Sequence, residues 1–182
     1  MKRHIPAVSS PEESEVILDA FQNGLVELLP RLRRFARAVA GGALEADVLV
    51  QAAVQRGLER RGQWRPDTRL DSWMFTIMTN AWIDATLSRG RREPLFAPSA
   101  AGEPAAGSDG EAVHARLEAR EVAAAMARLP EDQRLAVALV LVEGLSYREA
   151  AEALDIPMGT LTSRLVRGRQ ALLAQFEGGV AA

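Results

Sequence analysis

Residues 144–172 read GLSYREAAEALDIPMGTLTSRLVRGRQAL and carry the clearest structural signal in the chain. Ser146 stands three residues before Glu149, which is the spacing of a capping box at the start of a helix. The sequence 155–157, Asp-Ile-Pro, interrupts that helix, and a longer helix is predicted over 158–176. Two helices joined by a tight turn, of which the second is longer and basic, form a helix-turn-helix pattern.

The side chains of this segment divide into an apolar set and a polar set. The apolar set can fill the angle between the two helices: Ala150, Ala151, Leu154, Ile156, Leu161 and Leu165. The polar set lies near the outward N-terminal half of the second helix: Thr160, Thr162, Ser163, Arg164 and Arg167. Such a helix end can enter the major groove of DNA, where arginine donates to guanine edges and hydroxyls bond bases or phosphates. Arg148 and Arg169 are either phosphate contacts or surface charges. The alternative for the whole segment is a helical hairpin with a solvated arginine face.

The rest of the chain also has helical periodicity. No stretch alternates with a period of two, so the predicted fold class is all-α. Besides the pair above, the predicted helices are a short one around 16–21 with Ser9 or Ser10 as N-cap, and others at about 25–40, 43–61, 69–89, 113–128 and 131–142.

A compositional break divides the chain into two small domains. Residues 93–111 contain three prolines, three glycines and four acids without a single basic residue. Such a stretch cannot bury enough surface to offset the entropy of ordering it. We therefore predict a flexible acidic linker over 93–112, between an N-terminal domain at 12–92 and a C-terminal helix-turn-helix domain at 113–176.

Composition excludes several classes of function. The chain has no cysteine, and its two histidines, His4 and His114, lie far apart in sequence, so no metal site is predicted. No Ser-His-Asp set and no glycine-rich phosphate loop is evident, so we expect neither an enzyme nor a bound cofactor. No apolar run approaches the roughly 20 residues that span a bilayer, and no signal peptide follows the basic start. A cytoplasmic protein is expected.

Four motifs in one order resemble a known family, the extracytoplasmic-function sigma factors of bacterial RNA polymerase. GTLTSRLVRGRQALL at 159–173 resembles the promoter-reading helix of that family, and LPRLRRFA at 29–36 resembles its first core helix. EADVLVQ at 45–51 is similar to the stretch that docks on the polymerase clamp, and FTIMTN at 75–80, with Asp84, to the helix that follows the promoter-melting loop. The resemblance covers nearly all of residues 20–175. The Leu-Pro-Arg opening at 29–31 also resembles the general-stress subgroup of alphaproteobacteria.

The resemblance implies a role for each domain. The N-terminal one, like sigma-70 region two, would bind core polymerase through Asp47, Leu49, Val50, Gln51 and Gln55. It would hold the melted minus-ten element through Trp64, Arg65, Arg69, Asn80, Asp84 and Arg89. The C-terminal one, like region four, would read the minus-thirty-five element through Thr160, Thr162, Ser163, Arg164, Arg167 and Arg148. The implied partners are core RNA polymerase (the clamp of its largest subunit and the flap of the second), promoter DNA and an anti-sigma factor, in a stress response.

The chain departs from the family pattern at three places. Ala52-Ala53 replaces an acid and a hydroxyl, Val48 replaces a common acid, and Leu87-Ser88 stands where an arginine is usual. Some residues also have a structural alternative: Trp64 can pack the loop, and Asn80 with Asp84 can cap or brace it. A rival function is a stand-alone helix-turn-helix regulator that binds duplex DNA without polymerase and senses a ligand or partner through its N-terminal domain.

Overall fold

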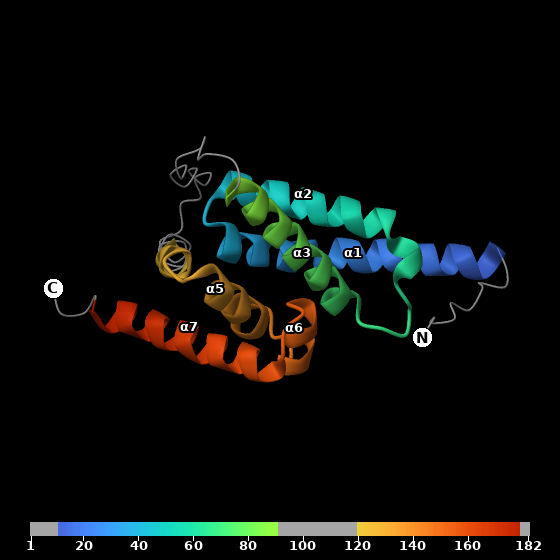
Figure 1. The fold of residues 1–182 in the computed structure, drawn as a ribbon. Helices are drawn as coiled ribbons and strands as arrows, with labels where there is room; N and C mark the ends of the chain where they lie inside the picture. Colours follow the sequence, from blue (N-terminus) through green and yellow to red (C-terminus); the bar gives the residue numbers. More distant parts are fainter. Residues whose placement is uncertain (1–10, 91–119, 179–182) are drawn as a thin grey trace, which may run out of the picture.

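The computed structural model describes residues 11–90 and 120–178, and every regular element in these ranges is a helix (Figure 1). The all-α prediction is confirmed for this part of the chain. The predicted linker and the two histidines lie outside it. No helix in the described ranges is long and apolar enough to cross a membrane.

The first helix, α1 (Pro11–Ala40), is one continuous element of 30 residues. The prediction of two separate helices here was wrong, because the predicted break at 22–24, which includes Gly24, is overridden by packing. A Cβ at Gly24 would lie 2.8 Å from Leu70 Cδ2, so this glycine permits close approach by the start of α3. Pro30 removes one backbone hydrogen bond but lies on the exposed side. Buried residues lie along α1 on both sides of it, from Phe21 to Val39.

Two more helices complete the N-terminal half. Gly41, in the left-handed region at φ +75°, ends α1. The chain returns as α2 (Ala43–Glu59), passes through the 3-10 turn η1 (Arg61–Gln63), and enters α3 (Leu70–Gly90). Figure 1 shows α1 and α2 side by side, with α3 crossing both.

The C-terminal half is built from shorter helices. A helical segment at 120–127 precedes α5 (Glu131–Val137), which continues into a π-helical turn, η2 (Ala138–Val142). The helix predicted over 131–142 is therefore continuous, with its last five residues wound more widely. Gly144, at φ +72°, ends it. Then come α6 (Tyr147–Ala153) and α7 (Met158–Gly178).

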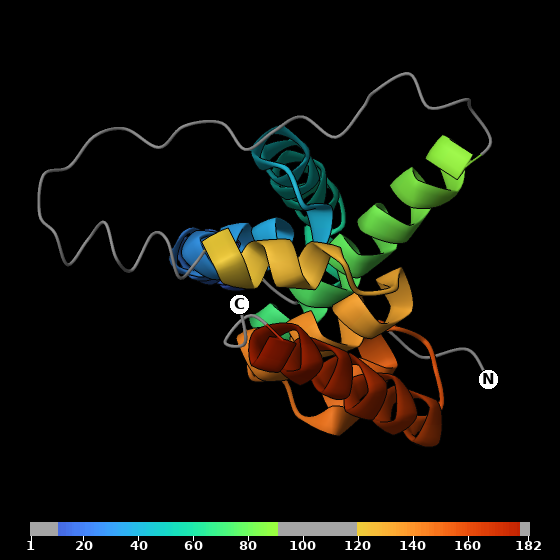
Figure 2. The same cartoon turned by 90° about the vertical axis from the view of Figure 1, so that its left-hand side faces the viewer.

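The two halves share one core. Buried apolar residues of both belong to a single cluster that includes Phe35 and Phe75 as well as Leu135, Leu139 and Leu161. Helices α1 and α3 pack against α5, η2 and α6, and Figures 1 and 2 show α5–α7 grouped on one side of α1–α3.

Candidate nucleic-acid interface

The helix-turn-helix is built by α6, a short turn and α7. The predicted capping box is confirmed: the Ser146 hydroxyl accepts from the Glu149 backbone N–H, and Glu149 Oε2 accepts from the Ser146 backbone N–H at 2.9 Å. In the turn, Asp155 has φ 51°, a left-handed conformation that Asp tolerates better than most residues. The predicted wedge is also confirmed, since Ala150, Ala151, Leu154, Leu161 and Leu165 are buried and Ile156 packs on the core.

The outward face of α7 presents most of the predicted reading residues. Thr162, Ser163 and Arg167 are exposed, and Thr160 is half-buried. The Thr162 hydroxyl donates to Met158 O and the Ser163 hydroxyl to Thr160 O, both at 2.9 Å. Each hydroxyl oxygen keeps lone pairs that can accept from a DNA base.

Arg164 lies at the margin of this face. Its Nε is 3.2 Å from Asp132 Oδ2 of α5, and its side chain is 28% exposed. This ion pair ties α7 to α5. The aliphatic part of Arg164 is therefore held at the α5–α7 contact rather than projecting like Arg167.

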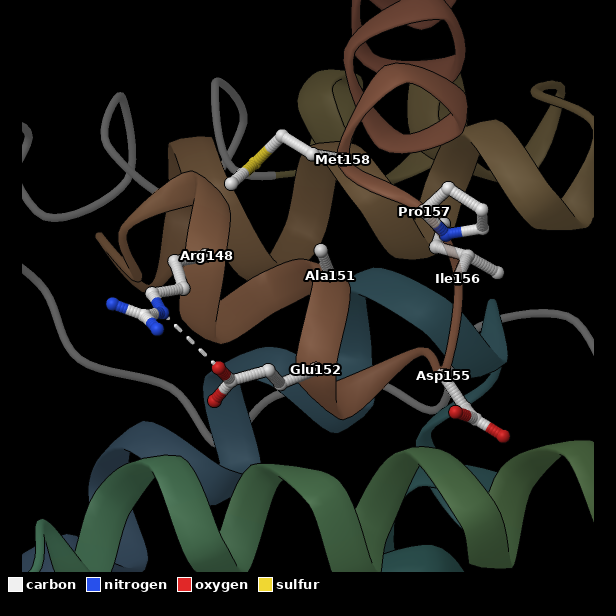
Figure 3. Close-up of a pocket in the computed structure, with 7 residues that line it drawn as sticks. All are labelled: Arg148, Ala151, Glu152, Asp155, Ile156, Pro157 and Met158. Carbon is white, nitrogen blue, oxygen red and sulfur yellow. Dashed lines mark hydrogen bonds and ion pairs between the residues drawn. The ribbon is translucent and has the colours of Figure 1, made fainter.

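A hollow of about 430 Å³ lies beside the turn (Figure 3). It is lined by Arg148, Ala151, Glu152, Asp155, Ile156, Pro157 and Met158. Arg148, predicted as a phosphate contact, is 83% exposed in its side chain and pairs with Glu152 at 3.3 Å. The carboxylates of Glu152 and Asp155, which also line the hollow, do not favour an anion inside it. No group of three possible metal ligands occurs among the described residues.

The predicted minus-ten loop follows η1. Trp64 packs on Phe21, with ring centroids 5.6 Å apart, and Phe21 also contacts Trp73. The Trp64 Nε1 atom is buried and has no hydrogen-bond partner among residues 11–90 and 120–178. Of the two alternatives for Trp64, this geometry favours loop packing. Arg65 is exposed.

Arg69 has carboxylate partners on both halves of the chain. It forms two hydrogen bonds with Asp71, at 3.0 and 2.7 Å, and its Nη1 is 2.8 Å from Glu149 Oε1 of α6. The hydrogen bonds that Arg69 donates to Asp71 raise the pKa of Arg69, which stays charged.

The remaining minus-ten candidates lie along α3. Asn80 is exposed, one turn before Asp84 on the same side of the helix. Asp84 pairs with Arg56 of α2 at 3.0 Å, so it joins α3 to α2 rather than bracing the loop. The side chain of Arg89 lies outside the described residues.

The predicted polymerase-docking set divides between surface and core. Asp47, Gln51 and Gln55 are exposed, whereas Leu49 and Val50 are 5% and 7% exposed and belong to the core. The structure therefore does not place these last two on the docking face. Two apolar residues that the predicted docking set did not include are exposed instead: Leu44 is 70% exposed and Val48 is 57% exposed, on the side of α2 opposite the buried residues. The periodicity of the whole helix, with 46, 49, 50, 53 and 57 facing inward, would have found them.

Asp71 is the most strongly perturbed acid of this region. Its Oδ2 lies 2.8 Å from Arg31 Nη1 and 2.7 Å from Arg69 Nη2. Burial by itself raises the pKa of Asp71, but hydrogen bonds from Arg69 and Arg31 outweigh it and lower the pKa to about 2.

Acidification is therefore expected to remove a stabilising contribution of Asp71. Since its pKa falls from 3.8 to about 2 on folding, the carboxylate contributes about 2 kcal/mol at neutral pH. This contribution is fully present above about pH 4 and is lost as the pH falls through 2. Denaturant unfolding of the wild type and Asp71→Asn from pH 5 to pH 2 measures it. The difference in unfolding free energy should shrink over that window, and a constant difference would contradict the prediction.

Comparisons with known proteins cover both halves. Residues 25–79 match the sigma2 domain of PhyR, and residues 119–172 match sigma-70 region 4. The ECF RNA polymerase sigma factor EcfG of Rhodopseudomonas palustris is 35% identical over 158 residues, which cover 87% of this chain and 86% of that protein. The ECF RNA polymerase sigma-E factor of Escherichia coli is 31% identical over 133 residues, 68% of this chain and 70% of the relative.

Among solved structures, the sigma factor RpoE from Bartonella quintana, in complex with the anti-sigma factor NepR, is similar at a TM-score of 0.73 and 29% identity. That match covers 87% of this chain and 97% of the other. CnrH, in complex with the cytosolic domain of CnrY, shares the fold at a TM-score of 0.65 and 24% identity, over 88% of this chain and 90% of that one. Two domain matches in the expected order, and a relative matched over 86% of its length, lead to one conclusion: the chain belongs to the ECF RNA polymerase sigma factors.

Proposed function

We propose that this chain directs core RNA polymerase to a set of stress-response promoters and helps to open them, under the control of an anti-sigma factor. The observation that carries the proposal is the combination, on one chain, of a capped helix-turn-helix with an exposed polar α7 and an exposed mixed apolar and polar face on α2. A DNA reader alone has no use for the second surface. In this function the chain catalyses no reaction of its own and binds no cofactor, and it acts in the cytoplasm, where the polymerase is.

The N-terminal half of α7 reads the minus-thirty-five element as duplex DNA. Thr162, Ser163 and Arg167 would contact base edges, with Thr160 and Arg164 at the margin and Arg148 on the phosphates. Support comes from their exposure on one helix end and from the absence of any acid between Asp155 and Glu177 in the sequence.

Arg167→Ala is expected to weaken binding to a duplex promoter by about 1–3 kcal/mol, because a guanidinium that donates to a guanine edge contributes about that much. Fluorescence anisotropy with labelled duplex at fixed salt measures the affinity. Arg33→Ala is the matched control, since it removes an exposed arginine from α1. Equal affinities for both variants would take Arg167 out of the reading surface.

The minus-ten element would be held as a single strand by the loop after η1 and by α3. Arg65 and Arg69 supply positive charge, and Asn80 supplies paired donors and acceptors. Trp64, packed on Phe21, supports the loop from within. Asp84 and Arg89 would act at the far end of α3.

Core polymerase would dock on the exposed face of α2. Its clamp would contact Asp47, Gln51 and Gln55, together with the exposed Leu44 and Val48, while Leu49 and Val50 hold the helix in place from the core. The flap of the second large subunit would contact the C-terminal half. A helix face that exposes both apolar and polar groups suits a partner that covers the whole face.

The double variant Leu44→Asp with Val48→Asp is expected to lower affinity for core polymerase about tenfold or more. Full burial of each apolar side chain in the interface contributes about 1.5–3 kcal/mol, and an aspartate at the same position loses that contribution. Val16→Asp, on α1 at 68% exposure, is the control. Surface-immobilised core polymerase and purified variants give the dissociation constants. Unchanged binding by the double variant would place the docking face elsewhere.

An anti-sigma partner is proposed because a sigma factor of similar structure, RpoE from Bartonella quintana, is bound to the anti-sigma factor NepR. The partner would cover surfaces that polymerase or DNA needs, and would release the chain under stress.

Run-off transcription on genomic promoter fragments tests the function. We expect transcripts that appear only when the chain is added to core polymerase. No transcript, together with a duplex still bound by the chain alone, would instead favour the stand-alone regulator.

A further inference from the structure

The interface between the two halves carries an inference that rests on the proposed function. We infer that the packed arrangement is an autoinhibited state of the free chain, held closed by Glu143 between Arg31 and Arg34. Promoter binding requires this contact to open.

Glu143 is an acid from the C-terminal half that is buried by the N-terminal half. Its side chain is 0% exposed. Arg34 donates to it through Nε and Nη2, both at 2.9 Å, and Arg31 through Nε at 3.3 Å. Arg31 Nη2 also donates to the Glu143 backbone oxygen at 2.9 Å. In the described part of the chain, the donors recorded for this carboxylate therefore lie on α1.

A glutamate at this position fits a contact that forms and breaks. A buried carboxylate is tolerated only beside its cations, and a well-packed apolar residue usually stabilises a permanent interface as well or better. If the halves separate, Glu143 and both arginines regain water, so the open state leaves no charge unpaired. A leucine here would instead add to the apolar surface that the shared core exposes when the halves separate.

A second contact occupies a residue assigned to DNA. Arg69 lies 2.8 Å from Glu149 Oε1, and the Ser72 hydroxyl donates to the same oxygen at 2.8 Å. Glu149 thus places a carboxylate against an arginine that, in the proposed function, supplies positive charge to a single strand. Arg69 therefore faces a carboxylate of the C-terminal half in the closed state and loses that partner on opening, while its pair with Asp71 remains.

The size of the closed body gives the third argument. The minus-ten and minus-thirty-five elements lie roughly 25 base pairs apart, which corresponds to about 85 Å of duplex. A compact chain of this length has a diameter of only about 40 Å, and even α1, the longest helix, extends about 45 Å. One closed body cannot engage both elements, so the halves must separate on a promoter.

The test measures opening in the free chain, without polymerase. Because the sequence contains no cysteine, Arg60→Cys and Gln170→Cys place one donor and one acceptor fluorophore on exposed positions of the two halves. We expect high transfer efficiency in the wild type and a clear drop in Glu143→Gln. Glu177→Gln, an exposed acid on α7, is the matched control and should keep the wild-type value. Arg34→Gln removes the pair from the other side and should open the chain equally, which covers the case in which Glu143→Gln does not fold.

Function is measured on the same variants. At limiting core polymerase, Glu143→Gln and Arg34→Gln should give several-fold more run-off transcript than the wild type. If both variants keep the wild-type transfer efficiency, the contact of Glu143 with Arg31 and Arg34 does not hold the halves together. If the variants open but give no more transcript than the wild type, the closed state is not autoinhibited. Failure of the proposed function is distinguishable, because the wild type would then give no transcript at all while the fluorescence result stands.

Discussion

Phe35→Ala is expected to lower the free energy of unfolding by about 3–5 kcal/mol, the range for removing a fully buried aromatic ring. Phe35 is 0% exposed on α1, and its ring centroid lies 5.4 Å from that of Phe75 on α3. The guanidinium of Arg31 lies over the other ring, 5.3 Å from the Phe75 centroid. The truncation would therefore leave a cavity where α1 and α3 meet, beside the arginine that holds Glu143.

Denaturant unfolding followed by circular dichroism measures this loss. Val26→Ala is the control on the same helix, since Val26 is 66% exposed and its truncation is expected to change stability by less than about 0.5 kcal/mol. A loss below about 1 kcal/mol for Phe35→Ala would mean that the ring is not enclosed as the structure has it.

The helix-turn-helix could be predicted because its signals are local. The capping box needs only Ser146 and Glu149, and the wedge needs only the helical period on either side of the turn. Both are confirmed by the structure. The family motifs likewise needed only short stretches in one order.

Continuity of α1 could not be predicted from its own residues. Gly24 and Pro30 both weaken a helix locally, and their cost is offset by contacts with α3 that the sequence does not display. The division of the docking set on α2 has a related cause. A match to the motif 45–51 assigns Leu49 and Val50 to the docking face together with Asp47. Which of these side chains points outward, however, depends on the helical period of the whole of α2.

Packing between the halves had very little local signal in the sequence. Arg31 and Glu143 are separated by 112 positions, and each is an ordinary charged residue in its own segment. The single hint was an acid directly after the apolar run 135–142, a position that becomes buried only when α1 covers it. The pairing of Arg69 with Glu149 was hidden for the same reason, because the resemblance assigned Arg69 to DNA and the capping-box spacing assigned Glu149 to a helix cap.

Leu161→Ala is expected to destabilise the chain by about 2–5 kcal/mol and to reduce duplex promoter binding in proportion to the unfolded fraction. Leu161 is 0% exposed and lies where the wedge joins α6 to α7. Val166→Ala, at 48% exposure on the same helix, is the stability control. Thr162→Ala separates the two effects, because it removes an exposed hydroxyl and should weaken binding without changing stability.

The same variant reports whether the two halves unfold together. All three tryptophans, Trp64, Trp73 and Trp82, lie in the N-terminal half, whereas Leu161 lies in the C-terminal half. If the shared core makes one cooperative unit, tryptophan fluorescence and circular dichroism of Leu161→Ala shift together, because coincident transitions mark two-state unfolding. A dichroism transition that moves while the fluorescence transition stays would mean that the helix-turn-helix unfolds alone. Adding Glu143→Gln to Leu161→Ala should convert the first behaviour into the second, because the ion pair is then no longer available to hold the halves together.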